Sequence, residues 1–262
     1  MRATILGSGS SGGVPVVGIG WGACDPGNRK NRRMRSSVLI ESGDTIVLVD
    51  TSPDLRQQLL DANVRRLDAV VYTHPHADHL HGIDDLRGIN RAMNAPINAY
   101  GDANTLKHIA DRFGYVLTPL PGDNVTYYKP TLNAHEITAG NSFDINCLTV
   151  DVFDQNHGYS RTLGFRFGPI GYSTDLVEMT NQGYDALAGV DTWIVGVFTD
   201  KPHKTHVHLA KALKWIEQVE PRRAVLTHLG PDLDYEEVLK LVPDVGVEAA
   251  FDGMVVEAEH DG

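Results

Sequence analysis

The chain has few cysteines, no long apolar run and a deficit of positive charge. Its 262 residues include 2 cysteines, Cys24 and Cys147, so a disulfide framework is excluded and the reducing cytoplasm is the expected location. The longest apolar runs, such as 46–49 and 194–197, are far shorter than the roughly 20 residues that span a bilayer. The first residues also lack the apolar stretch of a secretory signal. We therefore expect no membrane association.

The charge balance bears on the partners of the protein. Lys and Arg number 23 against 34 Asp and Glu, a net charge of −11, which disfavours binding to a nucleic-acid backbone. A small anionic substrate would need local positive charge to be held. One basic cluster could supply it or could be a solvated loop, and both interpretations stay open: Arg29, Lys30, Arg32, Arg33 and Arg35. A homodimer is allowed, but no residue indicates one.

Strand-like and helix-like segments alternate through most of the chain. Apolar runs predict strands at 3–6, 38–40, 45–49, 69–72, 148–153, 164–167, 193–197, 224–226 and 254–257. Helical spacing predicts helices at 54–62, 209–219 and 235–241, whereas the glycine-rich stretch 7–31 predicts a loop. No linker of distinct composition divides the chain, and 42% hydrophobic residues suffice for a core. The pattern predicts one α/β (α+β) domain, residues 1–262, with a two-sheet core and helices outside.

The strongest chemical signal follows the strand at 69–72. The sequence His74-Pro75-His76-Ala77-Asp78-His79 places four potential metal ligands in six residues. Residues two apart on an extended segment point the same way, so His74 and His76 can share one ion. The turn after them can bring Asp78 and His79 to a second ion. A solvated histidine-rich turn is the alternative, but three imidazoles beside a carboxylate favour a metal site.

Further ligand-type residues stand just beyond other predicted strands. His157 follows the strand at 148–153, Asp175 follows the apolar segment at 170–174, and His228 follows the strand at 224–226. Taken singly, each is more typical of a loop or a turn than of a site. Together with the His74 to His79 segment, they offer enough ligands for two ions.

In this order the residues resemble the full ligand set of the metallo-β-lactamase superfamily, and Leu48-Val49-Asp50-Thr51 resembles its acidic strand end. The resemblance spans nearly the whole chain and implies a four-layer αββα sandwich with the site along one edge of the paired sheets. Carried over by position, it implies one ion held by His74, His76 and His157, a second held by Asp78, His79 and His228, and Asp175 as the bridge.

Three further segments resemble the PhnP-type phosphodiesterases of carbon-phosphorus lyase (phosphonate) pathways: 6–15, 32–37 and 251–254. Those enzymes act on phosphoribosyl 1,2-cyclic phosphate. The segment Thr205-His206-Val207-His208 matches the one that carries their substrate-facing histidine, at His206. These relatives often hold a structural zinc through a cysteine-rich loop and a later histidine. Here that loop keeps only Cys24, and Pro231 stands at the position of the histidine, so we expect no structural zinc.

The resemblance implies a dinuclear, metal-dependent phosphoric diester hydrolase that acts through a metal-bridging hydroxide. Histidine and aspartate ligands suit two divalent ions, Zn or Mn, and do not choose between them. Asp78 can orient or deprotonate the attacking water, and His206 can bind the phosphoryl oxygen and protonate the leaving alkoxide. His203 lies close enough in sequence to His206 to remain a candidate contact for the small phosphodiester substrate.

Several alternatives compete with this hypothesis. The segment 7–12 matches the dinucleotide-binding pattern GxGxxG, but proline and more glycine follow it where a helix should begin. tRNA 3′-processing endoribonucleases share the ligand set, yet they usually insert an RNA-binding arm where only 175 − 157 = 18 positions separate His157 from Asp175. Other hydrolases of this fold, including relatives associated with pyrroloquinoline quinone, remain open. A metal-binding protein without catalysis would predict a broken ligand set, and all seven positions are intact.

Overall fold

Two seven-stranded sheets form the centre of the structure, a computed structural model that describes residues 1–121, 126–243 and 245–258. The first sheet has the order β14 (Val255–Glu257), β1 (Arg2–Gly7), β2 (Ser37–Ser42), β3 (Thr45–Val49), β4 (Ala69–Val71), β5 (Ile97–Gly101), β6 (Leu132–Glu136). The second has the order β13 (Val247–Ala249), β12 (Arg223–Thr227), β11 (Thr192–Gly196), β10 (Ile170–Ser173), β9 (Arg161–Phe167), β8 (Leu148–Asn156), β7 (Ser142–Ile145).

Strand alternation divides the apolar side chains into three layers. In β3, Val47 and Val49 face the second sheet and join a buried cluster with Phe165 of β9, whereas Leu48 faces the opposite way. In β11, Ile194 joins the same central cluster, whereas Trp193 packs on the outer side. Because successive side chains of a strand point to opposite faces, each sheet buries one face against the other sheet and one against helices.

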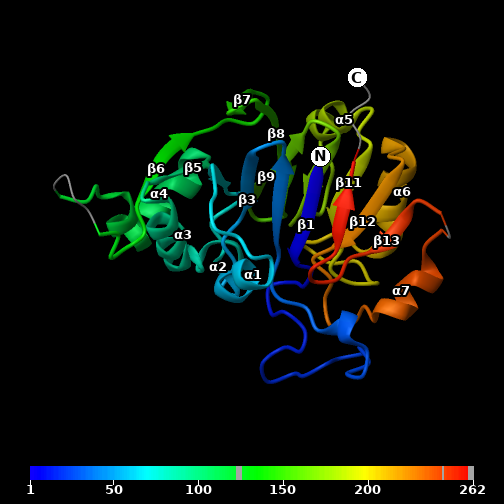
Figure 1. Ribbon diagram of the computed structural model, residues 1–262. Coiled ribbons are helices and arrows are strands. Elements are labelled where there is room, and N and C mark those ends of the chain that lie inside the picture. The colour runs from blue at the N-terminus through cyan, green and yellow to red at the C-terminus, as the bar shows by residue number, and fades with distance from the viewer. Residues whose placement is uncertain (122–125, 244, 259–262) are drawn as a thin grey trace.

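Helices cover both outer faces. The first sheet is covered by α1 (Leu55–Asp61), α2 (Ala77–Leu80), α3 (Leu86–Met93) and α4 (Ala103–Phe113), and the second by α5 (Asn181–Leu187), α6 (Leu209–Val219) and α7 (Tyr235–Leu241). Short 3₁₀ turns lie at Arg29–Asn31, Ile83–Asp85 and Gly114–Leu117. Figure 1 shows α1 to α4 on the left, α6 and α7 on the right, and the sheets between them. The predicted αββα sandwich is confirmed.

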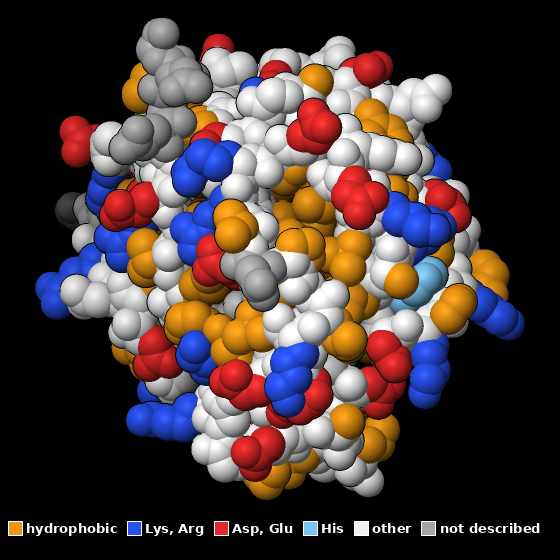
Figure 2. Space-filling model, turned by 90° about the vertical axis from the view of Figure 1, so that its right-hand side faces the viewer, with side chains coloured by type: hydrophobic (Ala, Val, Ile, Leu, Met, Phe, Trp, Pro, Cys, Tyr) orange, Lys and Arg blue, Asp and Glu red, His pale blue; other side chains and the backbone are white. Residues whose placement is uncertain are grey.

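Every strand and helix predicted from the sequence is present, and no end is shifted by more than three residues. The largest shifts are in β8, which continues to Asn156, and in β9, which begins at Arg161. The sequence analysis did not predict α2, α3, α4 and α5, nor β5, β6, β7 and β13. Among the described residues, no helix is long and apolar enough to cross a membrane. On the face beside α6 and α7, hydrophobic side chains gather in the middle among charged side chains of both signs (Figure 2).

The topology places the candidate residues at one edge. β10, β11, β12 and β13 run parallel, as do β3, β4 and β5, so the carboxyl ends of each group meet at the same edge of their sheet. The segments that follow β4, β8, β10, β11 and β12 contain every ligand candidate and His206. The glycine-rich loop also begins there, since the Ser10 N–H donates to the Leu229 carbonyl, next to His228.

Candidate metal centre

The segment between β4 and α2 holds the first two histidines. His76, the N-cap of α2, has extended dihedral angles (φ −66°, ψ 155°), and proline at 75 keeps the segment from starting the helix earlier. His74 Nε2 therefore lies 3.0 Å from His76 Nδ1. Asp78 and His79 lie one turn further on, in α2. Arg112 of α4 donates from Nη1 to the Pro75 carbonyl over 2.9 Å, which ties the segment between His74 and His76 to α4.

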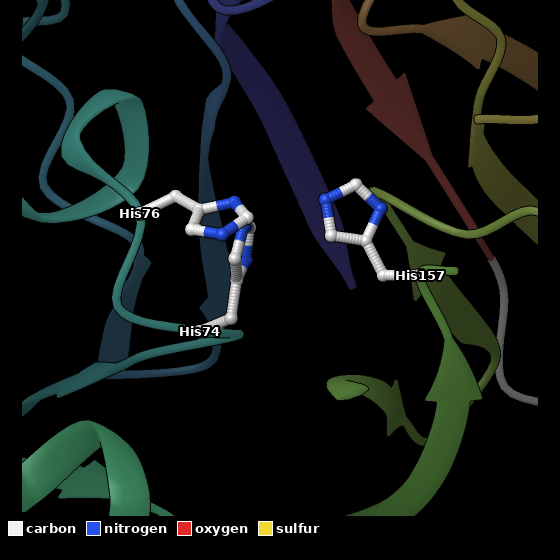
Figure 3. A group of neighbouring side chains, drawn as sticks. All are labelled: His74, His76 and His157. Carbon is white, nitrogen blue, oxygen red and sulfur yellow. The ribbon is translucent and has the colours of Figure 1, made fainter. Parts of the chain in front are cut away.

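His157, Asp175 and His228 come from the second sheet. Each directly follows a strand or lies two residues beyond one, and all three are buried. Asp175 and His228 have positive φ angles, 50° and 57°, as does Asp50 at the end of β3, 62°. Residues other than glycine adopt this left-handed conformation rarely, and such strain concentrates at functional sites. Figure 3 shows His74 and His76 on one side of the centre and His157 on the other.

The carboxylate of Asp175 lies at the middle of the histidines. Its Oδ2 is 2.7 Å from His79 Nε2 and 4.0 Å from His74 Nε2. Its Oδ1 is 2.7 Å from His206 Nε2, 3.3 Å from His228 Nε2 and 4.0 Å from His157 Nε2. A single carboxylate therefore reaches toward both halves of the expected ligand set.

The described residues offer three groups whose ligand atoms lie within 4.8 Å of one another. They are His74, His76 and His157; Asp78, His79, Asp175 and His228; and His157, Asp175 and His206. The first two groups match the two expected ion sites, and Asp175 lies 4.0 Å from two members of the first. The structure thus brings all seven predicted ligands together.

The donor set fits divalent metal ions. The buried Nε2 atoms of His79 and His228 make no hydrogen bond within the described part of the chain, although both approach Asp175. Three carboxylates, Asp50, Asp78 and Asp175, surround His79 within 3.2 Å. Buried carboxylates at this density need compensating positive charge, and histidine nitrogens with carboxylate oxygens are ligands that zinc accepts.

Hydrogen bonds on the far side of the rings fix which nitrogen faces the centre. His79 Nδ1 lies 2.6 Å from Asp50 Oδ2, and His157 Nδ1 lies 2.7 Å from the Thr205 carbonyl. The Thr73 hydroxyl donates to Asp50 Oδ2, so it accepts from His74 Nδ1 at 2.9 Å. Each ring donates from Nδ1 and turns Nε2 inward, which is the usual support of a metal-bound histidine.

The ionisation of the site follows from burial and close charges. Burial lowers the pKa of His74 well below its usual range and that of His228 to about 4, which favours neutral rings. Burial also lowers the pKa of His79, but Asp78, Asp175 and Asp50 raise it well above the usual range. Burial raises the pKa of Asp175, but His228 and His79 outweigh this and hold it well below the ordinary value. The Asp175 carboxylate is therefore ionised and can bind cations.

His206 lies in the site, between Phe198 and His157, with its Nε2 toward Asp175. Its Nδ1 lies 2.8 Å from the Thr205 hydroxyl and 3.4 Å from Nδ1 of the exposed His203. His208 is the N-cap residue of α6, without a side-chain cap bond. The structure thus brings His206 next to the Asp175 carboxylate.

Most of the basic cluster is engaged within the fold. Lys30 bonds the Tyr235 hydroxyl, Arg32 lies over the Trp21 ring, and Arg35 forms a two-bond ion pair with Asp54. Arg33 is 2% exposed. Its guanidinium bonds the Gly230 carbonyl, the Asn31 side chain and Cys24 Sγ. Residues separated by about 200 positions are thus joined there by hydrogen bonds.

The comparisons with known sequences agree with the site. The family model described as the Beta-lactamase superfamily domain matches residues 45–229. A protein named octanoyltransferase from Porphyromonas gingivalis is 34% identical over 268 residues, which is 100% of this chain and 52% of that protein. A ribonuclease Z from Bradyrhizobium sp. is 26% identical over 160 residues, 58% of this chain and 49% of that protein. The chain spans about half the length of these curated relatives.

Solved structures share the whole fold. A structure described as a new diphosphatase from the PhnP family has a TM-score of 0.89 and 30% identity, covering 99% of this chain and 98% of that one. Zn²⁺-bound PqqB from Methylobacterium extorquens has a TM-score of 0.76 and 18% identity, covering 98% and 100%. Human tRNase Z, short form, has a TM-score of 0.69 and 20% identity, covering 98% and 99%. At these lower identities the last two show the fold alone.

The chain belongs to the metallo-β-lactamase superfamily. Within the superfamily it is of the PhnP type. Sequence reasoning did not identify Arg112, Ser36 or Thr73 as neighbours of the ligands. Thr73 directly precedes His74, so a hydroxyl beside the first ligand was the available signal.

Proposed function

We propose that this protein hydrolyses a small phosphodiester, such as phosphoribosyl 1,2-cyclic phosphate, with two divalent ions, Zn or Mn. The observation that carries the proposal is the convergence of seven ligand-type side chains and His206 on Asp175. The full-length likeness to a PhnP-family diphosphatase supports phosphorus-centred chemistry. Two ions bound in such a site supply positive charge for the phosphoryl oxygens and lower the pKa of water to near neutrality.

The residues have distinct proposed roles. His74, His76 and His157 would hold one ion, Asp78, His79 and His228 the other, and Asp175 would contact both. Asp78 is partly exposed beside the buried His79, so its carboxylate can orient the attacking water and accept its proton. His206 Nε2 faces the same centre from the segment after β11, and it can donate a proton to the leaving alkoxide.

The known relatives leave other substrates to be tested. The chain has no insertion between His157 and Asp175, where only β9, β10 and their turns lie, and its net charge is −11. These features favour a small substrate over RNA. The relative named octanoyltransferase is about twice as long as the matched part, so its name does not link acyl transfer to any residue of this chain.

The test is hydrolysis by Zn- and Mn-loaded protein of phosphoribosyl 1,2-cyclic phosphate, an aryl phosphodiester and a diphosphate diester. Precursor tRNA and an octanoyl thioester serve as competing substrates. Asp175→Ala should abolish turnover, whereas Asp151→Ala, which removes a half-buried carboxylate of β8 bonded to Ser142, should not. Loaded protein that is inert on all three phosphorus substrates but cleaves RNA or the thioester would refute the proposal.

A further inference from the structure

Among the described ligand candidates, His228 has its Nδ1 partner on the opposite sheet. It directly follows β12, is 1% exposed and has a positive φ angle of 57°. Its Nδ1 contacts neither a carboxylate nor a backbone carbonyl but the hydroxyl of Ser36, 2.9 Å away. Ser36 precedes β2 in the first sheet, 192 residues earlier in the chain. The ring that faces the second expected ion is therefore fixed from the opposite sheet.

The hydrogen count at Ser36 determines the direction of this bond. Ser36 Oγ also lies 2.9 Å from the Gly9 carbonyl, which can only accept. The single hydroxyl hydrogen of Ser36 donates to that carbonyl, so the oxygen accepts from His228 Nδ1. Nδ1 then carries the ring proton, and the lone pair of Nε2 points to the centre, where it makes no hydrogen bond to a described residue. This is the tautomer that binds a metal through Nε2.

The segment that carries Ser36 is anchored through residues 31–33, just before it in the chain. Arg33 donates to the Gly230 carbonyl over 3.3 Å and to Asn31 Oδ1 over 3.2 Å. Asn31 donates in turn to Asp234 Oδ2 over 2.6 Å. Residues 31–33 are thus hydrogen-bonded to residues 230–234, which follow His228 in the chain. Ser36 and His228 are held in register by bonds that do not involve the metal centre.

The only other hydroxyl near His228 Nδ1 within the described chain is a weaker partner. Thr174 Oγ1 is 3.5 Å away, and it lies 3.3 Å from Asp175 Oδ2, to which it donates. At that distance a hydrogen bond contributes little. Loss of the Ser36 hydroxyl would therefore free the ring to rotate or to move its proton to Nε2.

We infer that Ser36 is a positioning residue that holds His228 in the metal-binding tautomer, and that the buried Arg33 fixes the segment that carries it. The inference rests on the metal centre of the proposed function. The N-terminal loop thereby controls affinity at the ion of Asp78, His79 and His228, without contacting that ion. The ion of His74, His76 and His157 does not depend on this bond.

The first experiment reads the tautomer in metal-free protein. Long-range ¹H–¹⁵N correlation spectra of histidine-labelled protein, assigned with a His228→Gln variant, should show His228 protonated at Nδ1. In Ser36→Ala the same ring should become a mixture of tautomers. A wild-type His228 protonated at Nε2 would overturn the inference. This measurement needs no metal and no activity.

The second experiment measures metal binding by competition with a chromophoric chelator. Ser36→Ala should lose about 10- to 100-fold in affinity for one ion and less than about threefold for the other. Thr192→Val is the control, because Thr192 is also fully buried, its hydroxyl bonds Asp191, and it lies at the amino end of β11, away from the edge that holds the centre. Unchanged affinity for both ions in a folded Ser36→Ala would overturn the inference. Wild-type protein that binds no divalent metal would refute the proposed function, and the tautomer spectra would still decide the role of Ser36.

Discussion

Replacing Asp50 with asparagine is the sharpest test of how the centre is built. Asp50 is fully buried and accepts three hydrogen bonds: from the Thr73 N–H at 2.8 Å, the Thr73 hydroxyl at 2.8 Å and His79 Nδ1 at 2.6 Å. Its φ of 62° is a conformation that asparagine tolerates, so the backbone should be retained. The substitution therefore changes the charge and one acceptor atom.

The geometry sets the size of the effect. An amide can keep its oxygen at the position of Oδ2, which receives two donors, but its NH₂ then faces the Thr73 N–H. Leaving that buried N–H unpaired should lower the free energy of unfolding of the metal-free protein by about 1–3 kcal/mol. His79 also loses the carboxylate that orients its ring. Affinity for the ion at Asp78, His79 and His228 should fall by about 10- to 100-fold.

The other ion should respond less, because Asp50 reaches His74 only through the Thr73 hydroxyl. Chelator competition measures both affinities, and urea unfolding measures stability. Asp68→Asn is the control, since Asp68 also accepts a backbone N–H, from Ile46, but lies away from the centre. Equal affinities in wild type and Asp50→Asn, or a larger loss at the His74 ion, would show that the reasoning is wrong.

Three further predictions follow from residues already described. His206→Asn should slow cleavage of a phosphodiester with an alkyl leaving group by about 10²- to 10⁴-fold, because an alkoxide needs a proton to leave. Cleavage of a nitrophenyl ester should slow much less, and equal losses on the two substrates would exclude proton donation by His206. Arg33→Met removes the hydrogen-bond donor of the Gly230 carbonyl and of the Asn31 side chain, so the free energy of unfolding should fall by about 2–5 kcal/mol. Urea unfolding measures this, and a loss below about 1 kcal/mol would contradict the reasoning. Burial raises the pKa of Asp252 to about 6, above the value of the unfolded chain. The protonated carboxyl therefore stabilises the folded state fully below about pH 4, and this stabilisation is lost as the pH rises through 6. The stability difference between wild type and Asp252→Asn should therefore change across that range, and a flat difference would refute the shift.

The sequence was sufficient for the strands and ligands that local pattern defines. Continuous apolar runs predicted β2 and β3, and the spacing of His74 and His76 predicted a shared ion because an extended segment turns both rings the same way. His157, Asp175 and His228 were predicted from their places after strands. Parallel packing of those strands is what makes such places neighbours in space.

The rest of the site depends on contacts between distant parts of the chain. The bond between Ser36 and His228 spans 192 positions, and that between Asn31 and Asp234 spans 203. No local periodicity encodes such pairs, because they arise when β1 and β2 pack against the second sheet. Arg112 reaches Pro75 only because α4, a helix that the pattern analysis missed, lies on the first sheet. The sequence left two interpretations of the basic cluster open, a substrate-holding charge or a solvated loop, and only packing shows that Arg33 is buried and bonded to Gly230 and Asn31.

The ligand set is divided between the two sheets: His74 to His79 follow β4 of the first, and His157, Asp175 and His228 follow strands of the second. An ion bound by both groups would act as a removable cross-link across the sandwich. Binding to the folded state alone adds about 1.4 kcal/mol of stability for each tenfold excess of free metal over the dissociation constant. The melting temperature should then rise with the logarithm of metal concentration. The fraction of chains that is folded would thus follow the metal supply of the surroundings, independently of turnover.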